Sequence, residues 1–455
     1  MLSIVILAAG KGTRMRSALP KVLQPIAGKS LVAHVIKTAK TLTANPINII
    51  VGHGADQVKE TLAAIDCLNF IKQKEQLGTG HAVQQALPYF PKDGVVLILY
   101  GDVPLISKET LLSLTAVVNK NSLGLLTVNV EDPTGYGRII RDVNNQVISI
   151  VEQKDARNAE LMVKEVNTGV MAVNSAHLHA WLPALSNTNS QREYYLTDII
   201  AMAKARGVSI NTRQPLHEWE VLGVNDRRQQ AQLERIYQLR LAEQLLVEGV
   251  TLLDPSRFDL RGKLVVGADV IIDVNCIFKG HVTIGDNVSI GANCIIGNTT
   301  IASGSVINDN CILEGATIKL KCTIGPFARL RPDTVLEDNA KIGNFVETKK
   351  LHVGKGSKIN HLSYVGDATL GEGVNIGAGT ITCNYDGVNK HLTVIGNDVF
   401  VGSNTALVAP VTLADGVTIG AGSTINKSVE KNTLALARAP QKTHKEWSRP
   451  EKIIK

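Results

Sequence analysis

The second half of the chain repeats with a period of six residues. Aliphatic side chains recur at this spacing at Val401, Leu407, Leu413, Ile419 and Ile425, and a Gly, Asn or Ala usually follows them. Six residues match neither the 3.6-residue turn of an α-helix nor the two-residue alternation of a half-buried strand. The period is typical of a parallel β-helix, in which each face is a short strand and each corner a tight turn. A β-sandwich with regular turns is the alternative, but it would not keep one register over so long a stretch.

The same period extends toward the middle of the chain. It recurs at Ile284, Ile290, Ile296, Ile324, Leu330, Leu336 and Ile342. We therefore predict a coil from about Val250 to Ile425. The register skips near Thr382–Thr393. Because an insertion in a solenoid becomes a protruding loop, and often the binding loop, we expect such a loop here.

The first part of the chain follows an α/β pattern of apolar segments that alternate with helical ones. The expected strands are Ser3–Leu7, Ile47–Val51, Val95–Tyr100, Gly124–Val130 and Gly169–Val173. Several are apolar on both faces, as buried parallel strands must be. We predict a Rossmann-like domain with a mixed, mostly parallel sheet at residues 1–225. A connecting helix at 226–249 and a β-helix domain with a C-terminal tail at 250–455 are expected to follow.

The charge balance favours small phosphorylated ligands over nucleic acid. The chain has 48 Lys and Arg residues against 41 Asp and Glu, a net charge of +7, and the basic residues are spread out. No basic stripe is interleaved with aromatic residues, as nucleic-acid binding would require. We therefore expect no nucleic-acid partner.

The cysteines and the N-terminus predict a cytoplasmic protein. The six cysteines form no CxxC pair and no metal-ligand spacing, so we expect reduced thiols. The run Leu2–Ala9 lacks a preceding positive charge and breaks at Gly10, which indicates a buried strand and not a signal peptide. No later segment is long enough to span a membrane, so no membrane partner is expected.

A small-residue loop follows the first expected strand, in the sequence Leu7-Ala8-Ala9-Gly10-Lys11-Gly12-Thr13-Arg14-Met15, with Lys21 shortly after. Such a loop lets backbone N–H groups approach phosphates, and nearby cations offset their charge. The dinucleotide fingerprint GxGxxG fails, because Met15 occupies the third glycine position. The P-loop pattern fails as well. A plain strand-to-helix turn remains the alternative for two glycines alone.

An aspartate lies at the end of another expected strand, in Tyr100-Gly101-Asp102. Open α/β sheets bind ligands at the carboxyl ends of their strands. A carboxylate there can hold Mg²⁺, which takes few protein ligands in addition to phosphate oxygens. The alternative for a single strand-end aspartate is a helix cap.

These motifs together carry a resemblance to a known family. Leu7–Arg14, Gln76–Gly80 and Tyr100–Asp102 resemble the nucleoside-triphosphate sugar-1-phosphate nucleotidyltransferases. With the C-terminal repeats, the whole chain resembles the bifunctional bacterial enzymes that join an N-acetylglucosamine-1-phosphate uridylyltransferase to a glucosamine-1-phosphate N-acetyltransferase. The resemblance implies UTP, acetyl-CoA and Mg²⁺ as reactants and cofactor. It also implies a product, UDP-N-acetylglucosamine, that supplies peptidoglycan and lipopolysaccharide synthesis.

The resemblance assigns roles to residues of the first domain. Those implied to bind the UDP-sugar are Leu7, Ala8, Ala9, Gly10, Lys21, Gln73, Gly78, Thr79, Tyr100, Gly101, Asp102, Gly137, Glu152, Asn167 and Asn225. Among them, Gly137, Glu152 and Asn167 would hold the N-acetylglucosamine. Asp102 and Asn225 would bind Mg²⁺. Arg14 and Lys21 would act in catalysis by meeting the phosphates.

The repeats alone are compatible with a mere trimerisation stalk, so a second activity must rest on side chains. Arg331 and Lys349 are cations suited to a sugar phosphate, and the imidazole of His361 could act as a base that takes a proton from an attacking amine. The alternative for a single histidine is a surface or core group. The resemblance makes His361 the general base and implies that Arg331, Lys349, Tyr364 and Asn375 bind glucosamine-1-phosphate. The residues implied along acetyl-CoA are Ala378, Asn384, Tyr385, Ser403, Ala421 and Arg438, with the Asn384-Tyr385 pair also assigned to the sugar phosphate.

The resemblance further implies a left-handed coil and a homotrimer, in which the tail of one chain completes a neighbour's acetyltransferase site. Two rival functions remain open at this point. One is a monofunctional nucleotidyltransferase with a regulatory β-helix, as in ADP-glucose-forming enzymes. The other is a sugar-nucleotide-binding scaffold whose β-helix serves only assembly.

Overall fold

The computed structural model describes residues 1–452 and divides into two compact units, Met1–Tyr237 and the chain from Gln238 onward. The first unit is built on a mixed sheet with strand order β11-β7-β10-β6-β1-β4-β5, and β8 and β9 pair beside β10. β1, β4, β5 and β6 run parallel, whereas β10 is antiparallel to β6 and β7. The strands are β1 (Leu2–Ala8), β4 (Ile47–Val51), β5 (Leu68–Lys72), β6 (Val95–Tyr100), β7 (Ser122–Asn129), β8 (Arg138–Arg141), β9 (Val147–Val151), β10 (Glu165–Asn174) and β11 (Ser209–Arg213).

Helices cover both faces of this sheet. Along β1, Ile4 and Ile6 belong to one core cluster and Val5 and Leu7 to another, because neighbouring side chains of a strand point to opposite faces. Residues of α1, α2 and α4 join the first cluster, and residues of α3, α6 and α7 join the second. The predicted α/β domain with a mixed sheet is thereby confirmed. The helices are α1 (Leu31–Lys40), α2 (Ala55–Leu62), α3 (Thr79–Gln84), α4 (Lys108–Thr115), α5 (Asn158–Leu161), α6 (Ser175–Trp181) and α7 (Asp198–Ala205).

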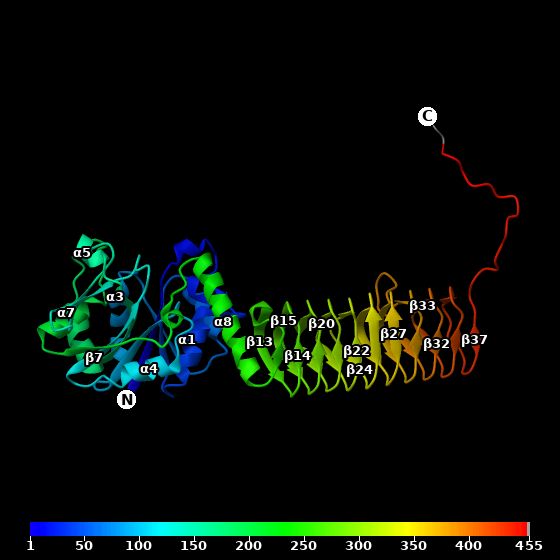
Figure 1. Ribbon diagram of the computed structural model, residues 1–455, viewed down its shortest axis with the longest axis horizontal. Helices are drawn as coiled ribbons and strands as arrows, with labels where there is room; N and C mark the ends of the chain where they lie inside the picture. Colours follow the sequence, from blue (N-terminus) through cyan, green and yellow to red (C-terminus); the bar gives the residue numbers. More distant parts are fainter. Residues whose placement is uncertain (453–455) are drawn as a thin grey trace. The chain divides into compact units, whose positions relative to one another are not determined.

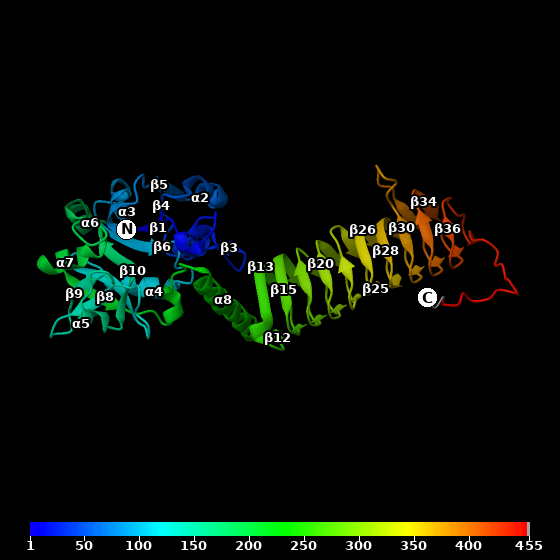
Figure 2. The same ribbon diagram turned by 90° about the horizontal axis from the view of Figure 1, so that it is seen from above.

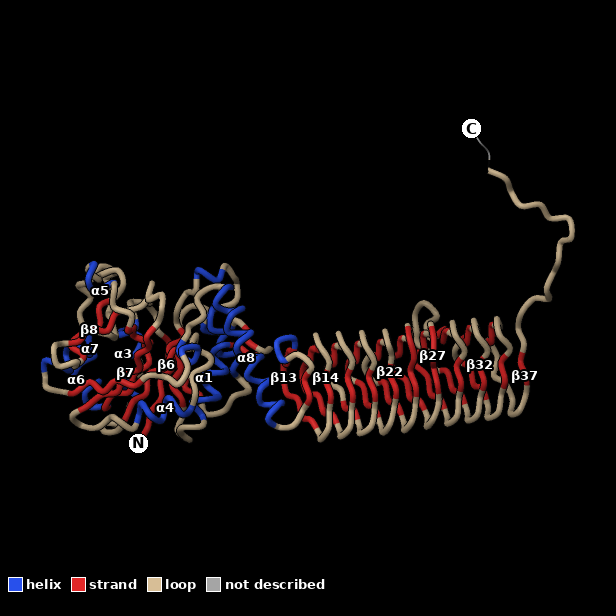
Figure 3. Tube along the Cα trace, in the orientation of Figure 1, coloured by secondary structure: helices blue, strands red, loops and turns tan. Residues whose placement is uncertain are grey.

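The second unit is a parallel β-helix of short strands separated by turns (Figure 1, Figure 3). One sheet contains β12 (Thr251–Leu252), β14 (Ile271–Ile272), β16 (Ser289–Ile290), β19 (Val306–Ile307), β22 (Thr323–Ile324), β25 (Lys341–Asn344), β27 (Lys358–His361), β29 (Asn375–Ile376), β32 (Phe400–Val401), β35 (Thr418–Ile419) and β37 (Leu434–Ala435). The other contains β13 (Phe258–Val266), β15 (Cys276–Ile284), β17 (Ile295–Gly297), β18 (Thr300–Ile301), β20 (Ile312–Glu314), β21 (Ala316–Ile318), β23 (Arg329–Leu330), β24 (Thr334–Leu336), β26 (Glu347–Val353), β28 (Tyr364–Leu370), β30 (Ile381–Cys383), β31 (Thr393–Ile395), β33 (Ala406–Val408), β34 (Val411–Leu413) and β36 (Thr424–Ile425). The coil thus continues beyond the expected end at Ile425.

Residues of the same type occupy equivalent positions on successive turns of the coil. Ile272, Ile290 and Ile307 occupy one position on three neighbouring turns, and all three are buried. At one corner, Asn275, Asn293 and Asn310 adopt positive φ of about 60°. Their side chains form a ladder, with Asn275 Nδ2 donating to Asn293 at 3.0 Å and Asn293 Nδ2 to Asn310 at 3.2 Å. Asparagine tolerates the left-handed region better than other side chains, and this explains the polar residues found at the corners.

The break in the six-residue period forms a loop between β30 and β31, at residues 384–392. It projects from the coil (Figure 2). Pairing resumes in register after the loop, because Thr369 lies opposite Val394 and Ile376 opposite Val401. The insertion therefore changes the surface of the coil and not its interior. Among residues 1–452, no helix is long and apolar enough to cross a membrane.

Helix α8 (Arg227–Val247) leads into the coil and closes its first turn. Gln238 is fully buried there, and its amide pairs with the backbone of one residue of β13. Its Nε2 donates to Leu260 O at 3.0 Å, and its Oε1 accepts from Leu260 N at 2.7 Å. Ala242 and Leu245 pack into the apolar core of the coil. A side chain thus takes the place of a missing neighbouring strand at an edge that would otherwise be unpaired.

We expect Gln238→Leu to lower the free energy of unfolding of the second unit by about 2–4 kcal/mol, because it leaves two buried backbone groups unpaired. Denaturant unfolding followed by circular dichroism would measure the loss. Gln244→Leu, at an exposed position of the same helix, serves as the control and should change stability by less than about 0.5 kcal/mol. Equal stability of the two variants would contradict the role given to Gln238.

Candidate active sites

A pocket of about 550 Å³ opens in the first unit at the carboxyl ends of β1 and β6. Many residues assigned to the UDP-sugar from the resemblance line it, namely Leu7, Ala8, Ala9, Gly10, Lys21, Gln73, Gly78, Thr79, Tyr100, Asp102 and Asn225. They come from segments distant in the sequence, and the parallel strands bring them to one edge of the sheet. This is the edge at which open α/β sheets bind ligands.

Two glycines permit close approaches at this pocket, since Gly78 lines it and Gly12 lies against Lys21, which lines it as well. Gly12 has φ of 61°, and a Cβ on it would lie 2.5 Å from Lys21 Cβ. Gly78 has φ of 108°, and a Cβ there would lie 2.7 Å from Tyr194 O. Larger residues would be strained by the backbone and blocked by these neighbours. The glycines therefore allow Lys21 to reach the pocket and the loop after β5 to pack on the segment around Tyr194.

The side-chain oxygens of Asp102 and Asn225 both contact the ammonium group of Lys21 in this pocket. Lys21 Nζ forms an ion pair with Asp102 Oδ2 and donates to Asn225 Oδ1 at 3.2 Å. Arg14 Nη2 also donates to Asn225 Oδ1, at 3.0 Å. A carboxylate and an amide oxygen that meet at one positive charge fit Mg²⁺, which prefers oxygen ligands and keeps room for phosphates. Residues 1–452 contain no cluster of three or more His, Cys, Asp or Glu side chains suited to a metal.

Tyr100 connects this pocket to the residues assigned to the sugar. Burial raises the pKa of the Tyr100 hydroxyl above its usual range, and the nearby charges of Glu152 and Asp102 raise it further. The hydroxyl therefore stays protonated and can donate a hydrogen bond. Gly169, with φ of 83°, lies against the ring, and a Cβ on it would be 2.5 Å from Tyr100 Cε2.

The sugar residues gather beside Tyr100 but do not line the pocket itself. Asn167 N donates to Gly137 O at 2.8 Å. A Cβ on Gly137 would lie 3.4 Å from both carboxylate oxygens of Glu152. Thr197 Oγ1 donates to Glu152 Oε1 at 3.2 Å. The three assigned residues are therefore neighbours, although they come from three different segments.

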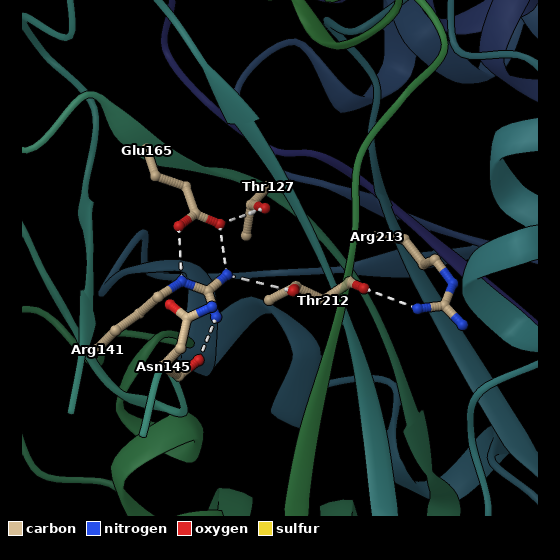
Figure 4. A network of polar contacts seen from close by, with 6 residues as sticks. All are labelled: Thr127, Arg141, Asn145, Glu165, Thr212 and Arg213. Carbon is tan, nitrogen blue, oxygen red and sulfur yellow. Dashed lines mark hydrogen bonds and ion pairs between the residues drawn. The ribbon is translucent and has the colours of Figure 1, made fainter. Parts of the chain in front are cut away.

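A polar network holds the strands that carry these residues (Figure 4). Arg141 of β8 binds Glu165 of β10 in a bidentate pair, with distances of 2.8 and 2.7 Å. Glu165 also accepts from Thr127 Oγ1 of β7 at 2.7 Å, and Arg141 Nη2 donates to Thr212 Oγ1 of β11 at 3.2 Å. The bidentate geometry fixes β8 against β10, and Gly137 and Asn167 lie at this junction.

Some residues that line the first pocket were not predicted from the sequence. Lys11, Val22, Gln76, Ala82 and Glu193 also line the pocket. Lys11 and Gln76 lie inside the motifs that carried the resemblance. Glu193 lies in a distant loop that no local pattern marks. It reaches the pocket because Tyr194 N donates to Leu77 O and Gly80 N to Tyr194 O, both at 2.8 Å.

Residues assigned to the second site form one column along an edge of the coil. Strand register places His361, Ala378, Ser403 and Ala421 at the same position of four successive turns. Neighbouring strands lie about 4.8 Å apart, so the column is about 14 Å long. After His361 the side chains of this column are small, namely Ala378, Ser403 and Ala421. We call these three positions the track, because they leave space along the surface for an extended ligand. Arg438 Nη1 donates to Ala421 O at 2.7 Å, at the far end of the track.

His361 lies at the near end of this column and is oriented by Asn344 on the preceding turn. The His361 Nδ1 and Asn344 Oδ1 atoms are 2.6 Å apart. Because the amide oxygen only accepts, it selects the tautomer with the proton on Nδ1. The lone pair on Nε2 is then available as a base. Sequence reasoning missed Asn344, since only the register of β25 and β27 brings it opposite His361.

Cations of the second site lie on the neighbouring face of the coil. Arg331 and Lys349 occupy equivalent positions on adjacent turns, and Arg331 Nη1 forms an ion pair with Glu347 at 2.9 Å. Lys390, in the protruding loop, lowers the pKa of Lys349, and Arg331 adds to the effect. Lys390 was not predicted, because the loop brings it back only through the bridge between Tyr385 and Lys390. Three cations thus concentrate positive charge where a phosphate could bind.

The loop also positions two predicted residues. Asn384 Nδ2 donates to Asp367 and, at 3.5 Å, to the Tyr364 hydroxyl. Tyr385 is exposed, and its hydroxyl donates to Gly387 O. Asn375 lies on β29, one turn beyond Lys358 of β27. The structure therefore brings Tyr364 and Asn384 together, with the exposed Tyr385 next to Asn384, whereas Asn375 lies on the other sheet of the coil.

The carboxylate of Glu152 yields a stability prediction. Burial raises the pKa of Glu152, and Asp155, Asp198 and Glu193 raise it further by repulsion, while the bond from Thr197 opposes them. A raised pKa means that the folded protein favours the protonated form of Glu152. The stability that this protonated form contributes is lost as the pH rises through the raised pKa, and the ionised form then lowers the free energy of unfolding. Glu152→Gln keeps an acceptor for Thr197 without the charge. We expect this variant to have a higher unfolding midpoint than the wild type at pH 7.5, with a smaller difference near pH 4.5.

Calorimetric scans at the two pH values would test this expectation. Glu109→Gln removes an exposed carboxylate from the same unit and is the control. A midpoint of Glu152→Gln below that of the wild type at pH 7.5 would contradict the argument.

Comparisons with known proteins match both units. The family models matched are the MobA-like NTP transferase domain at residues 4–160, the GMPPB C-terminal domain at 260–353 and the bacterial transferase hexapeptide at 392–427. The hexapeptide match confirms the predicted left-handed parallel β-helix. The chain is 60% identical over 452 residues to the bifunctional protein GlmU of Saccharophagus degradans, covering 99% of this chain and 100% of that protein. It is 58% identical over 451 residues to the bifunctional protein GlmU of Marinobacter nauticus, covering 99% of each.

Proposed function

The chain belongs to the GlmU family of bifunctional proteins, and we propose that it makes UDP-N-acetylglucosamine in two consecutive reactions. The second unit transfers an acetyl group from acetyl-CoA to glucosamine-1-phosphate. The first unit then transfers the uridylyl group of UTP to the N-acetylglucosamine-1-phosphate formed, and pyrophosphate leaves. The observation that carries this proposal is the presence of two separate sites. One is the pocket of the first unit, which contains Lys21 and Asp102, and the other is the column of the second unit that begins at His361.

Uridylyl transfer requires two anionic substrates to meet. An oxygen of the sugar phosphate attacks the α-phosphorus of UTP, and no protein nucleophile is needed. Arg14 and Lys21 would offset the charge that develops on the leaving pyrophosphate. Asp102 and Asn225 would hold Mg²⁺, whose charge neutralises phosphate oxygens when it is bound. Gly137, Glu152 and Asn167 would orient the sugar, and Tyr100, which lines the pocket, has its ring against Gly169 of the strand that carries Asn167.

Acetyl transfer requires a base at the attacking amine. His361 Nε2 would take a proton as the amine of glucosamine-1-phosphate attacks the thioester carbon. The carbon–sulfur bond then breaks, and the departing coenzyme A thiolate takes this proton from the imidazolium to leave as the thiol. Asn344 holds Nδ1 and so keeps Nε2 free for this step. Arg331, Lys349 and Lys390 would bind the phosphate. The track of Ala378, Ser403 and Ala421 would accommodate the extended arm of acetyl-CoA, and Asn384 and Tyr385 of the protruding loop would also contact this substrate.

We place these reactions in the cytoplasm, where the product would supply peptidoglycan and lipopolysaccharide synthesis. The cysteines support this location, because they are free in the structure and those in the coil core are buried. Thiols in this state are typical of a reducing compartment.

The two sites predict a crossed pattern of activity loss. Asp102→Ala should lower UDP-N-acetylglucosamine formation by at least about 100-fold and leave acetyl transfer intact, because it removes a metal-binding oxygen of the first unit alone. His361→Ala should lower acetyl transfer by about 10²–10⁴-fold and leave uridylyl transfer intact. Release of pyrophosphate and of free thiol would measure the two reactions. His352→Ala, an exposed histidine of the same coil, is the control. Loss of both activities in either variant would contradict separate sites.

We also propose that the protein is a homotrimer. Phe327, Phe345 and Leu362 stack on successive turns of the coil and are 50%, 55% and 62% exposed. The two phenyl rings are 5.3 Å apart, and all three residues have positive φ, which costs about 1–2 kcal/mol for each such residue. An exposed apolar ladder held in a strained conformation supports burial against another copy of the chain. The acetyltransferase column ends beside this ladder, at His361.

Phe345→Asp is therefore expected to dissociate the trimer and to lower acetyl transfer while uridylyl transfer persists. The reason is that a neighbouring subunit would contribute residues to the acetyltransferase site but not to the uridylyltransferase site. Light scattering would give the molar mass. Val143→Asp, at a fully exposed position of the first unit, is the control. A Phe345→Asp protein with an unchanged molar mass and unchanged acetyl transfer would remove this ladder from the interface.

A further inference from the structure

Glu220 is a buried carboxylate that the proposed reactions do not use. It lies in the short helix η5 (Glu218–Val221) and is only 1% exposed. Its Oε2 accepts from the hydroxyl of Ser107, from Ser107 N at 3.3 Å and from Thr110 Oγ1 at 2.7 Å. Its Oε1 accepts from His217 N at 3.2 Å. A buried charge is tolerated only when it is well hydrogen-bonded, so these four bonds are strong constraints on its surroundings.

The partners of Glu220 lie in the two segments that carry the metal-binding oxygens. Ser107 follows Asp102 by five residues, and Glu220 precedes Asn225 by five. The other ends of the two segments are also joined, because Val224 N donates to Asp102 O at 2.9 Å. The segments therefore run antiparallel and are tied at both ends.

The residues between the two ties are anchored in the core. Val103, Ile106 and Val221 are buried in one apolar cluster, and Leu105 and Val224 are buried in another. Ser107 is the N-cap of α4, where its hydroxyl accepts from Thr110 N at 3.2 Å. The Glu220 carboxylate thus lies at the positive end of α4 and fixes where the segment after Asp102 enters that helix.

We propose that Glu220 is a positioning residue for the metal site: it locks segments 102–107 and 220–225 together, so that Asp102 Oδ2 and Asn225 Oδ1 stay directed at one cation. This inference rests on the proposed function of the two oxygens. Glu220 itself is tied to hydroxyl and backbone donors on the side of α4, and its effect on the cation is transmitted through the two segments. Loosening the tie would separate the oxygens and weaken cation binding without removing a ligand.

The test compares cation binding in the full-length wild type, Glu220→Ala, Glu220→Gln and Glu109→Gln. Mn²⁺ serves as the probe, and its free signal is followed by electron paramagnetic resonance with UTP present and UTP alone subtracted. We expect the dissociation constant for Mn²⁺ to rise about tenfold in Glu220→Ala. In Glu220→Gln, which keeps one acceptor oxygen, the rise should be smaller. Glu109→Gln removes an exposed charge from the first turn of the same helix and should match the wild type.

Kinetics separate positioning from general support of the fold. For Glu220→Ala we expect the Mg²⁺ concentration at half-maximal uridylyl transfer to rise about tenfold, while kcat at saturating Mg²⁺ stays within about threefold and acetyl transfer is unchanged. A variant that loses kcat or thermal stability but binds Mn²⁺ like the wild type would overturn the inference.

Two further outcomes are decisive. Should the first unit of Glu220→Ala fail to fold, Thr110→Val removes one bond of the tie, from Thr110 Oγ1 to Glu220, and leaves the Ser107 cap of α4 in place. This variant should weaken Mn²⁺ binding by a few-fold, and unchanged binding would overturn the inference. Absence of Mn²⁺ binding by the wild type itself would overturn the proposed metal site and this inference with it. Wild-type binding with an unaffected, folded Glu220→Ala overturns the inference alone.

Discussion

The parallel register of the coil is the constraint on which the second site depends. Because each turn repeats the backbone of the one before it, residues far apart in sequence come to occupy one position on successive turns. His361, Ala378, Ser403 and Ala421 form a column for this reason alone. Small side chains follow one another along this column, and the imidazole of His361 lies at one end of it. The interior isoleucines keep this alignment, since a shift by one residue would turn them outward.

The first unit brings residues that are distant in sequence to one site in a different way. Many of the residues that line its pocket come from loops at the ends of parallel strands, and each loop must be held by something other than strand pairing. Gly12 and Gly78 allow close packing of these loops, and the Arg141–Glu165 pair fixes the strands beside the sugar residues. A repetitive coil obtains its geometry from periodicity, whereas the α/β unit obtains it from individual contacts.

This difference explains what the sequence could predict. The six-residue period and the two-sided apolar strands mark both folds, and the motifs around Gly10, Gly78 and Asp102 mark the first pocket. Glu193, Asn344 and Lys390 could not be found in this way, because each reaches its site through a tertiary contact. The strand Arg138–Arg141 was also missed, since it is only four residues long and begins and ends with a charged arginine. The antiparallel direction of β10 could not be read either, because a run of apolar residues does not reveal strand direction.

The loop at residues 384–392 has a consequence for how such a protein can change. It leaves the coil after β30 and returns at β31, and the turns on either side remain stacked as if it were absent. Its length and composition are therefore uncoupled from the packing of the interior. A loop of this kind can change in sequence and length while His361 and the column behind it keep their places.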